Sequence, residues 1–244
     1  MVVELYLDLL SQPCRAVYIF AKKNNIPFEF KDVVLFKGQH MSEEFGKVNP
    51  LRKVPALKDE AFTLAENTAI LLYLSRKFNT PDHWYPSDGQ KRAKVDEYLS
   101  WQHTAIRAQG SKVFLIKALV PLLMDKPFPP EKLEGAIEEL NSTLKQFEEK
   151  FLQGKLFIVG NEISLADLVA LVELMQPVGA GYDVFEGSPK LAEWRHRVEE
   201  AIGKELFQQA HEAILNVKDM AAAAAQLDPQ LKEKLKQLLQ KNLK

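Results

Sequence analysis

The chain has 244 residues, with 33 acidic and 32 basic side chains and 46% hydrophobic residues. This composition is typical of a soluble globular protein of one or two domains, and it excludes a fibrous or disordered chain. A formal net charge of −1 provides no overall attraction to nucleic acid or anionic lipid, so the expected partner is a small molecule or another protein.

The chain has a single cysteine, Cys14, which cannot form an intramolecular disulfide. One cysteine is also too few for a CxxC motif or a Cys/His zinc site. We therefore expect a reducing compartment and no metal. The segment 1–10 contains acidic residues and no basic region, unlike a secretory signal. The longest nearly apolar runs, 114–124 and 168–175, are too short to span a bilayer. These features predict a cytoplasmic protein that binds neither membrane nor nucleic acid.

Residues 1–35 contain three predicted elements. Apolar and polar side chains alternate over residues 3–9, which is the period of a β-strand. The period then changes to that of a helix over residues 14–21, and two asparagines and a proline end this helix at 24–27. Aromatic and β-branched residues predict a second strand over 28–35.

A hairpin and a helix complete the predicted N-terminal unit. The short runs 56–58 and 62–64 predict two strands about a turn, and the apolar stripe over 66–78 predicts a helix. The order strand, helix, strand, hairpin, helix fits a thioredoxin-like α/β domain over residues 1–80. Residues 81–87 contain two prolines and no periodicity, and we interpret them as a linker.

The remaining residues, 88–244, predict an all-α domain. Helical stripes occur at 95–102, 133–151 and 165–172, without strand-like alternation. The tail 220–244 predicts one amphipathic helix whose leucines pack on the body of the protein. A membrane-surface helix is the alternative, but acidic residues and glutamines interrupt its basic face.

Ser164 and Asp167 form the sharpest structural motif in this half. Their spacing is that of an N-capping box, in which each side chain bonds the backbone N–H of the other residue. Because capping occupies both side chains, we interpret the pair as a folding signal and not as a catalytic pair.

Ser11 stands where the first strand ends and the first helix begins. A serine in this position is typical of an N-cap. Alternatively, since the start of a helix carries positive partial charge, the hydroxyl can donate a hydrogen bond to a bound thiolate and lower a thiol pKa from its usual value of about 8.5. No Ser/His/acid motif is evident, so we do not expect Ser11 to be a covalent nucleophile.

Other candidates have both structural and functional readings. Cys14 lies in S-Q-P-C, where a dithiol oxidoreductase has C-x-x-C, and its place on the apolar stripe favours a buried structural thiol. A cis Val54–Pro55 bond would turn backbone groups outward to pair with a peptide ligand. Asn67 is either a plain N-cap or part of a site for a carboxylate. His40 and Arg107, taken alone, are typical of surface residues.

Seven stretches of the sequence together resemble the glutathione S-transferases, most closely the theta class. Their order and spacing carry the resemblance, which covers most of residues 1–218. The stretches are ELYLDLLSQPCRAVYIFAKKN at 4–24, KGQH at 37–40, NPLRKVPALKD at 49–59, WYP at 84–86, VDEYLSWQH at 95–103, SLADLVA at 164–170 and PVGAG at 177–181.

The resemblance implies a thioredoxin-like domain that binds glutathione as co-substrate, an all-α domain that forms the electrophile pocket, and a homodimer. Ser11 takes the position of the catalytic serine, whose hydroxyl bonds the glutathione sulfur. Val54, before Pro55, matches the residue whose backbone pairs with the cysteinyl part of glutathione. His40 and Lys53 match residues near the glycine carboxylate.

Further roles follow from the same resemblance. Glu66 and Asn67 match the residues that bind the γ-glutamyl end, although position 67 is usually Ser or Thr in the family. Thr104 and Arg107 fall where the class lines its active site, and Arg107 would orient an anionic or polarised substrate. The tail beyond residue 218 is less similar to the family.

The implied activity is conjugation of glutathione to small electrophiles, namely alkyl and aralkyl halides and epoxides, with reduction of organic hydroperoxides as a further activity. Two alternatives stay open at this point. In the first alternative, the protein is a non-catalytic binding or assembly module with the same fold. In the second, Cys14 performs thiol–disulfide exchange.

Overall fold

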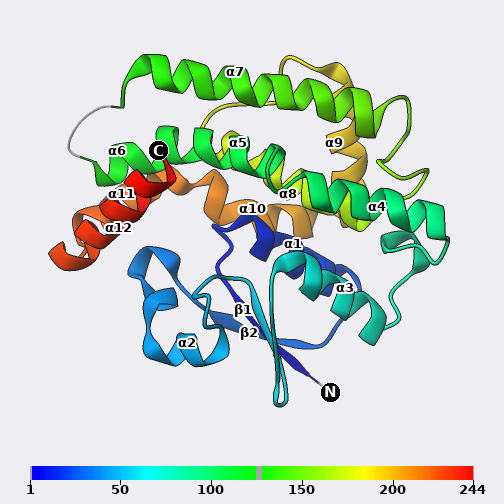
Figure 1. The fold of residues 1–244 in the computed structure, drawn as a ribbon, viewed down its shortest axis with the longest axis horizontal. Helices are drawn as coiled ribbons and strands as arrows, with labels where there is room; N and C mark the ends of the chain where they lie inside the picture. The colour runs from blue at the N-terminus through cyan, green and yellow to red at the C-terminus, as the bar shows by residue number, and fades with distance from the viewer. Residues whose placement is uncertain (1, 125–127, 244) are drawn as a thin grey trace.

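The computed structural model describes residues 2–124 and 128–243 (Figure 1). Its N-terminal part contains a four-stranded sheet in the order β2-β1-β3-β4. β1 and β2 are parallel, whereas the pairs β1–β3 and β3–β4 are antiparallel. The strands are β1 (Val3–Leu7), β2 (Phe28–Asp32), β3 (Ala56–Asp59) and β4 (Phe62–Ala65).

Three helices belong to this part, α1 (Gln12–Lys23), α2 (Glu43–Val48) and α3 (Asn67–Lys77). The alternation predicted for the first strand places Val3, Leu5 and Leu7 in the core with no exposed surface. α1 lies between the sheet and the C-terminal helices, with α3 beside it, and is buried along most of its length (Figure 1). A helix buried on all sides belongs to the interior of a protein.

The rest of the chain is helical, as predicted. α8 lies at its centre and is buried along nearly its whole length. In the described part of the chain, no helix is long and apolar enough to cross a membrane. The helices are α4 (Gly89–Trp101), α5 (Ile106–Phe114), α6 (Val120–Leu123), α7 (Pro130–Gln146), α8 (Leu165–Gly179), α9 (Pro189–Ile202), α10 (Lys204–Leu215), α11 (Met220–Ala225) and α12 (Pro229–Asn242).

The mixed sheet, the hairpin and the all-α second half confirm the predicted fold class, but both early strands are shorter than predicted. The Asp8 carboxylate explains this, because its two oxygens accept hydrogen bonds from the backbone N–H groups of Leu10 (2.9 Å) and Leu35 (2.8 Å). These bonds draw the chain out of the sheet after Leu7 and after Asp32. The prediction of a strand as far as residue 35 was therefore wrong.

A short helix, α2, was not predicted. Its start has an ordinary signal, since the Ser42 hydroxyl accepts a hydrogen bond from the Phe45 N–H at 3.1 Å. Glu43 and Glu44 follow in the first turn, where acidic side chains favour a helix. The helix was missed because it is too short to show an apolar period.

The tail forms two helices, which corrects the prediction of one helix over 220–244. α11 ends at Ala225, and the Asp228 carboxylate caps the new helix that Pro229 begins. A proline fits the first turn of a helix but not its interior, so the break falls before it. The predicted packing of the leucines is confirmed in part, since Leu239 is buried with Val120 and Leu123 while Leu238 is 42% exposed. Lys244 lies outside the described residues.

Asp167 holds the start of α8, as the predicted capping box requires. Its fully buried carboxylate accepts hydrogen bonds from the Ser164 N–H (3.0 Å), the Ser164 hydroxyl (3.0 Å), the Ile158 N–H (2.9 Å) and the Trp194 indole (2.9 Å). One side chain therefore joins α8, the segment before it and α9.

We expect Asp167→Ala to lower the free energy of unfolding by about 4 kcal/mol, because it leaves several buried donors without an acceptor. Asp88→Ala is the matched control, since Asp88 caps the exposed start of α4 through one bond to the Lys91 N–H. Its expected loss is about 1 kcal/mol. Urea unfolding measures both, and equal losses would contradict the proposed importance of the buried network.

Candidate active site

Two cavities flank the beginning of α1. The larger has a volume of about 290 Å³ and is mostly apolar, with its lining drawn from the segments 10–12, 35–40, 111–123, 217–220 and 235–242 and from Gln176 on α8. The smaller has a volume of about 190 Å³ and is mostly polar. The polar cavity is lined by Pro13, Asn49, Lys53, Val54, Pro55, Glu66, Asn67, His103 and Arg107.

Ser11 lines the apolar cavity at the N-cap position of α1, but its hydroxyl makes no capping hydrogen bond. Ser42 shows the contrast, because its hydroxyl does cap α2. The interpretation of Ser11 as a capping residue therefore loses its support. The Ser11 side chain does interact with the buried Cys14 thiol, and this interaction lowers the pKa of Cys14 against the larger effect of burial. The hydroxyl and the positive end of α1 stand together at the wall of a cavity, where an anion would be stabilised.

The turn before Ser11 is fixed by buried polar groups. The Ser11 N–H bonds the Asp8 carbonyl oxygen at 2.9 Å, while the Asp8 carboxylate holds the Leu10 N–H. The Arg15 guanidinium donates to the carbonyl oxygens of Leu9 (2.8 Å) and Leu10 (3.1 Å). Two charged side chains thus set the position of Ser11.

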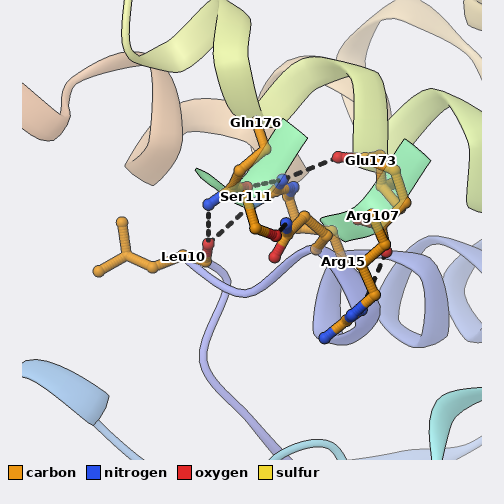
Figure 2. A network of polar contacts seen from close by, with 8 residues as sticks. Leu10, Arg15, Arg107, Ser111, Glu173 and Gln176 are labelled. Carbon is orange, nitrogen blue, oxygen red and sulfur yellow. Dashed lines mark hydrogen bonds and ion pairs between the residues drawn. The ribbon is translucent and has the colours of Figure 1, made fainter. Parts of the chain in front are cut away.

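Arg15 also ties this turn to α8, as Figure 2 shows. Its guanidinium donates to the Val172 carbonyl oxygen at 3.0 Å and to the Gln176 side-chain oxygen at 2.6 Å. Gln176 in turn donates to the Leu10 carbonyl oxygen at 3.2 Å. Burial lowers the pKa of Arg15 to about 10, so it remains charged at neutral pH. Sequence reasoning missed Arg15, because an arginine in a helix gives no sign of being buried.

The polar cavity brings together the predicted residues Lys53, Val54, Glu66 and Asn67. The Val54–Pro55 bond is cis, in agreement with the expectation. The Asn67 amide nitrogen is buried and has no hydrogen-bond partner in the described part of the chain. A buried donor without a partner is costly, so this amide is suited to bind a ligand group.

The prediction that Asn67 caps the third helix was wrong by one residue. Glu66 holds the cap position, and Asn67 is the first residue of α3. Glu66 has φ 70°, a left-handed conformation that is uncommon for a residue with a side chain. Such backbone strain occurs preferentially at binding sites.

Arg107 and Thr104 were both predicted near the active site, and the structure places them differently. Arg107 lines the polar cavity and pairs with Glu173 on α8 at 2.9 Å (Figure 2). Thr104 is exposed and is not among the residues that line either cavity. His103, which sequence reasoning missed, lines the polar cavity, and burial together with Arg107 lowers its pKa.

His40 and Lys53, predicted to act together, line different cavities. His40 contributes to the apolar cavity, and Lys53 to the polar one. The His40 Nδ1 is buried without a partner in the described residues, and burial lowers the pKa of this histidine. Burial therefore favours the neutral form of the His40 imidazole.

Cys14 is fully buried, and burial raises its pKa to about 12. A thiol with such a pKa is almost entirely protonated at neutral pH and is a poor nucleophile. This agrees with the structural reading of Cys14.

Comparisons with known proteins fit this arrangement. The family model described as "Glutathione S-transferase, N-terminal domain" matches residues 5–82, and "Glutathione S-transferase, C-terminal domain" matches residues 112–201. Glutathione S-transferase theta-1 of Gallus gallus is 62% identical over 99% of both chains. The Homo sapiens theta-1 protein is 60% identical over 96% of this chain and 95% of its own. The chain belongs to the theta class of the glutathione S-transferases.

Solved structures of this enzyme family agree with the assignment. Human glutathione-S-transferase T1-1 in its apo form superimposes with a TM-score of 0.94 at 57% identity. The match covers 99% of this chain and 100% of that one. A human theta-class enzyme in complex with the glutathione conjugate of 1-menaphthyl sulfate superimposes with a TM-score of 0.92 at 48% identity, covering 100% of this chain and 98% of that one.

We expect Arg15→Lys in this theta-class chain to lower the free energy of unfolding by about 3 kcal/mol, because an ammonium cannot satisfy the four acceptors that the guanidinium reaches. Arg52→Lys is the control, since Arg52 also donates to two backbone carbonyl groups but is exposed. Its expected loss is below about 1 kcal/mol. Chemical unfolding compares the two, and a loss at position 15 no larger than that at position 52 would contradict the role of Arg15.

Proposed function

We propose that this theta-class enzyme catalyses attack of the glutathione thiolate on small electrophiles, with Ser11 as the residue that stabilises the thiolate. The substrates proposed are alkyl and aralkyl halides and epoxides, with organic hydroperoxides as a further class. The proposal also includes a homodimer and a cytoplasmic location.

One observation carries the proposal: the Ser11 hydroxyl is not used for capping, although it lines the apolar cavity at the start of α1, two residues before Pro13, which lines the polar cavity. The polar cavity offers Lys53, Glu66 and Asn67, whose charges and amide complement the ionised and peptide groups of a tripeptide. The apolar cavity on the other side suits a hydrophobic electrophile.

The residues suggest a division of the reaction into three tasks. The polar cavity binds the ends of glutathione, so that its sulfur lies near Ser11. A hydrogen bond from the Ser11 hydroxyl and the positive end of α1 favour the thiolate over the thiol. The apolar cavity then holds the electrophile in line with the sulfur, and the carbon–halide or epoxide carbon–oxygen bond breaks as the carbon–sulfur bond forms.

The substrate class is supported by the apolar lining and by a relative. Leu115, Leu119 and Leu123 line the larger cavity together with Leu235 and Leu239 of α12. The human theta-class structure that contains the glutathione conjugate of 1-menaphthyl sulfate shows that an enzyme of this class accommodates an aralkyl conjugate. We extend this class of substrate to the present chain.

We expect Ser11→Ala to raise the pKa of bound glutathione by about one to two pH units, because the thiolate loses a hydrogen bond. Turnover of an alkyl halide at neutral pH should fall at least about tenfold, with the KM for glutathione changed less. Ultraviolet titration of the bound thiolate and steady-state kinetics across pH measure these effects.

Ser42→Ala is the matched control, because Ser42 is also an N-cap serine and lines neither cavity. It should leave the thiol pKa and turnover unchanged. A Ser11→Ala enzyme with normal turnover and normal thiol ionisation would refute the catalytic role. Retention of the wild-type protein on immobilised glutathione without turnover of any halide, epoxide or hydroperoxide would favour the non-catalytic binding module.

The thiol–disulfide alternative has its own test. We expect Cys14→Ala to keep at least half of the conjugating activity, because the buried Cys14 thiol is not the nucleophile. Thermal unfolding of the same variant separates a loss of stability from a loss of function. Disappearance of a glutathione-dependent reductase activity in a folded Cys14→Ala enzyme would instead support the exchange mechanism.

A further inference from the structure

Glu173 is a buried carboxylate for which the proposed reaction has no direct use. It lies on α8 with none of its side chain exposed, and its Oε1 accepts a hydrogen bond from the Arg107 guanidinium at 2.9 Å. Its second oxygen, Oε2, is buried and has no hydrogen-bond partner among residues 2–124 and 128–243. Within the described structure, the direct ionic contact of this carboxylate is therefore to Arg107.

Arg107 itself faces in two directions. Its side chain is 31% exposed and lines the polar cavity with Glu66, Asn67 and His103, while its Nη1 is bound to Glu173 (Figure 2). A guanidinium has five N–H donors in a rigid plane, so binding one carboxylate leaves an edge for a second acceptor.

The packing of α5 on α8 explains how the pair is brought together. Gly110 lies one turn after Arg107, and a Cβ at this position would come within 3.4 Å of the Glu173 carbonyl oxygen and 3.5 Å of the Pro177 ring. Both distances are ordinary van der Waals contacts, so α5 and α8 pack directly against each other along this stretch. The backbone of Arg107 on α5 is thus held near Glu173 on α8, and the Arg107 side chain extends to the polar cavity.

The energetics favour a fixed pair. A buried carboxylate without a cation is strongly unfavourable, and removal of one partner from a buried ion pair is destabilising. Burial raises the pKa of Glu173, while Arg107 and Arg15 oppose this effect. Glu173 therefore lies in the field of two arginines, one at the polar cavity and one that fixes the turn before Ser11.

We infer that Glu173 is a positioning residue for glutathione binding: it holds the Arg107 guanidinium at the wall of the polar cavity, where its free edge receives the γ-glutamyl carboxylate of glutathione. The inference rests on the proposed function, because it assigns the γ-glutamyl end to this cavity. Since that end of glutathione does not react, the contact stabilises the ground state and the transition state equally.

The expected signature is therefore in KM and not in kcat. We expect Glu173→Gln to raise the KM for glutathione about tenfold, with kcat at saturating glutathione within about twofold of the wild type. Arg107→Gln should raise the KM by at least as much. Because both residues act through one guanidinium, the KM of the double variant should be no higher than that of Arg107→Gln alone. If the two residues had independent roles, their increases in KM would multiply.

Glu139→Gln is the matched control. Glu139 forms an ion pair between α7 and α5 with Lys112 at 2.8 Å, but the pair is exposed and lines neither cavity. Its kinetics should equal those of the wild type. If Glu173→Gln does not fold, as thermal unfolding will show, Glu173→Asp retains the charge at a shorter reach and should raise the KM less, again with kcat preserved.

An unchanged KM in a folded Glu173→Gln enzyme would overturn the inference, and so would a fall in kcat alone or multiplicative effects in the double variant. Failure of the proposed function is distinguishable, because the wild-type protein would then lack glutathione-dependent turnover with every electrophile. A wild-type enzyme that is active, with variants that behave like Glu139→Gln, overturns only the role of Glu173.

Discussion

The hydrogen bonds of the buried Arg15 guanidinium are the interaction on which the arrangement of the candidate active site depends. An isolated charge in the interior is unfavourable, but this one reaches two carbonyl groups of the turn before Ser11 and two acceptors on α8. The bonds are satisfied only when the sheet domain and the helical domain are packed together. The Ser11 hydroxyl is therefore placed by both halves of the chain, although it belongs to the first.

The start of α1 separates the two environments that the proposed reaction requires. A thiolate is favoured where donors and a helix end supply positive charge, whereas a hydrophobic electrophile is favoured where water is excluded. The polar cavity lies beside Pro13 and the apolar cavity beside Ser11 and Gln12. Gln12 donates to the Ser111 hydroxyl at 2.8 Å, so the same turn of helix is also tied to α5.

Local periodicity was sufficient to predict most of the fold, since β1, α1, the hairpin and the capping box of α8 all follow from neighbouring residues. It failed where a side chain far along the chain decides the outcome. Asp8 ends both early strands through bonds to Leu10 and Leu35, and no local pattern at 33–35 reveals this. Motif resemblance suggested which residues surround glutathione, but Arg15 and Glu173 depend on how α1, α5 and α8 pack.

The tail, which lines part of the apolar cavity, is a second place where local periodicity did not predict the structure. The leucine spacing correctly predicted an apolar face. It could not predict the direction of the new helix that begins at Pro229. α12 then reaches the segment after β2, where Gly38 has φ 69° and a Cβ would lie 2.7 Å from the Leu231 side chain. Only a glycine both adopts this backbone conformation freely and leaves room for the leucine. The break before Pro229 and the glycine at 38 together allow Leu235 and Leu239 to join Leu35 and Phe36 around one cavity. The shape of this apolar cavity therefore depends on a contact between the first and last parts of the chain.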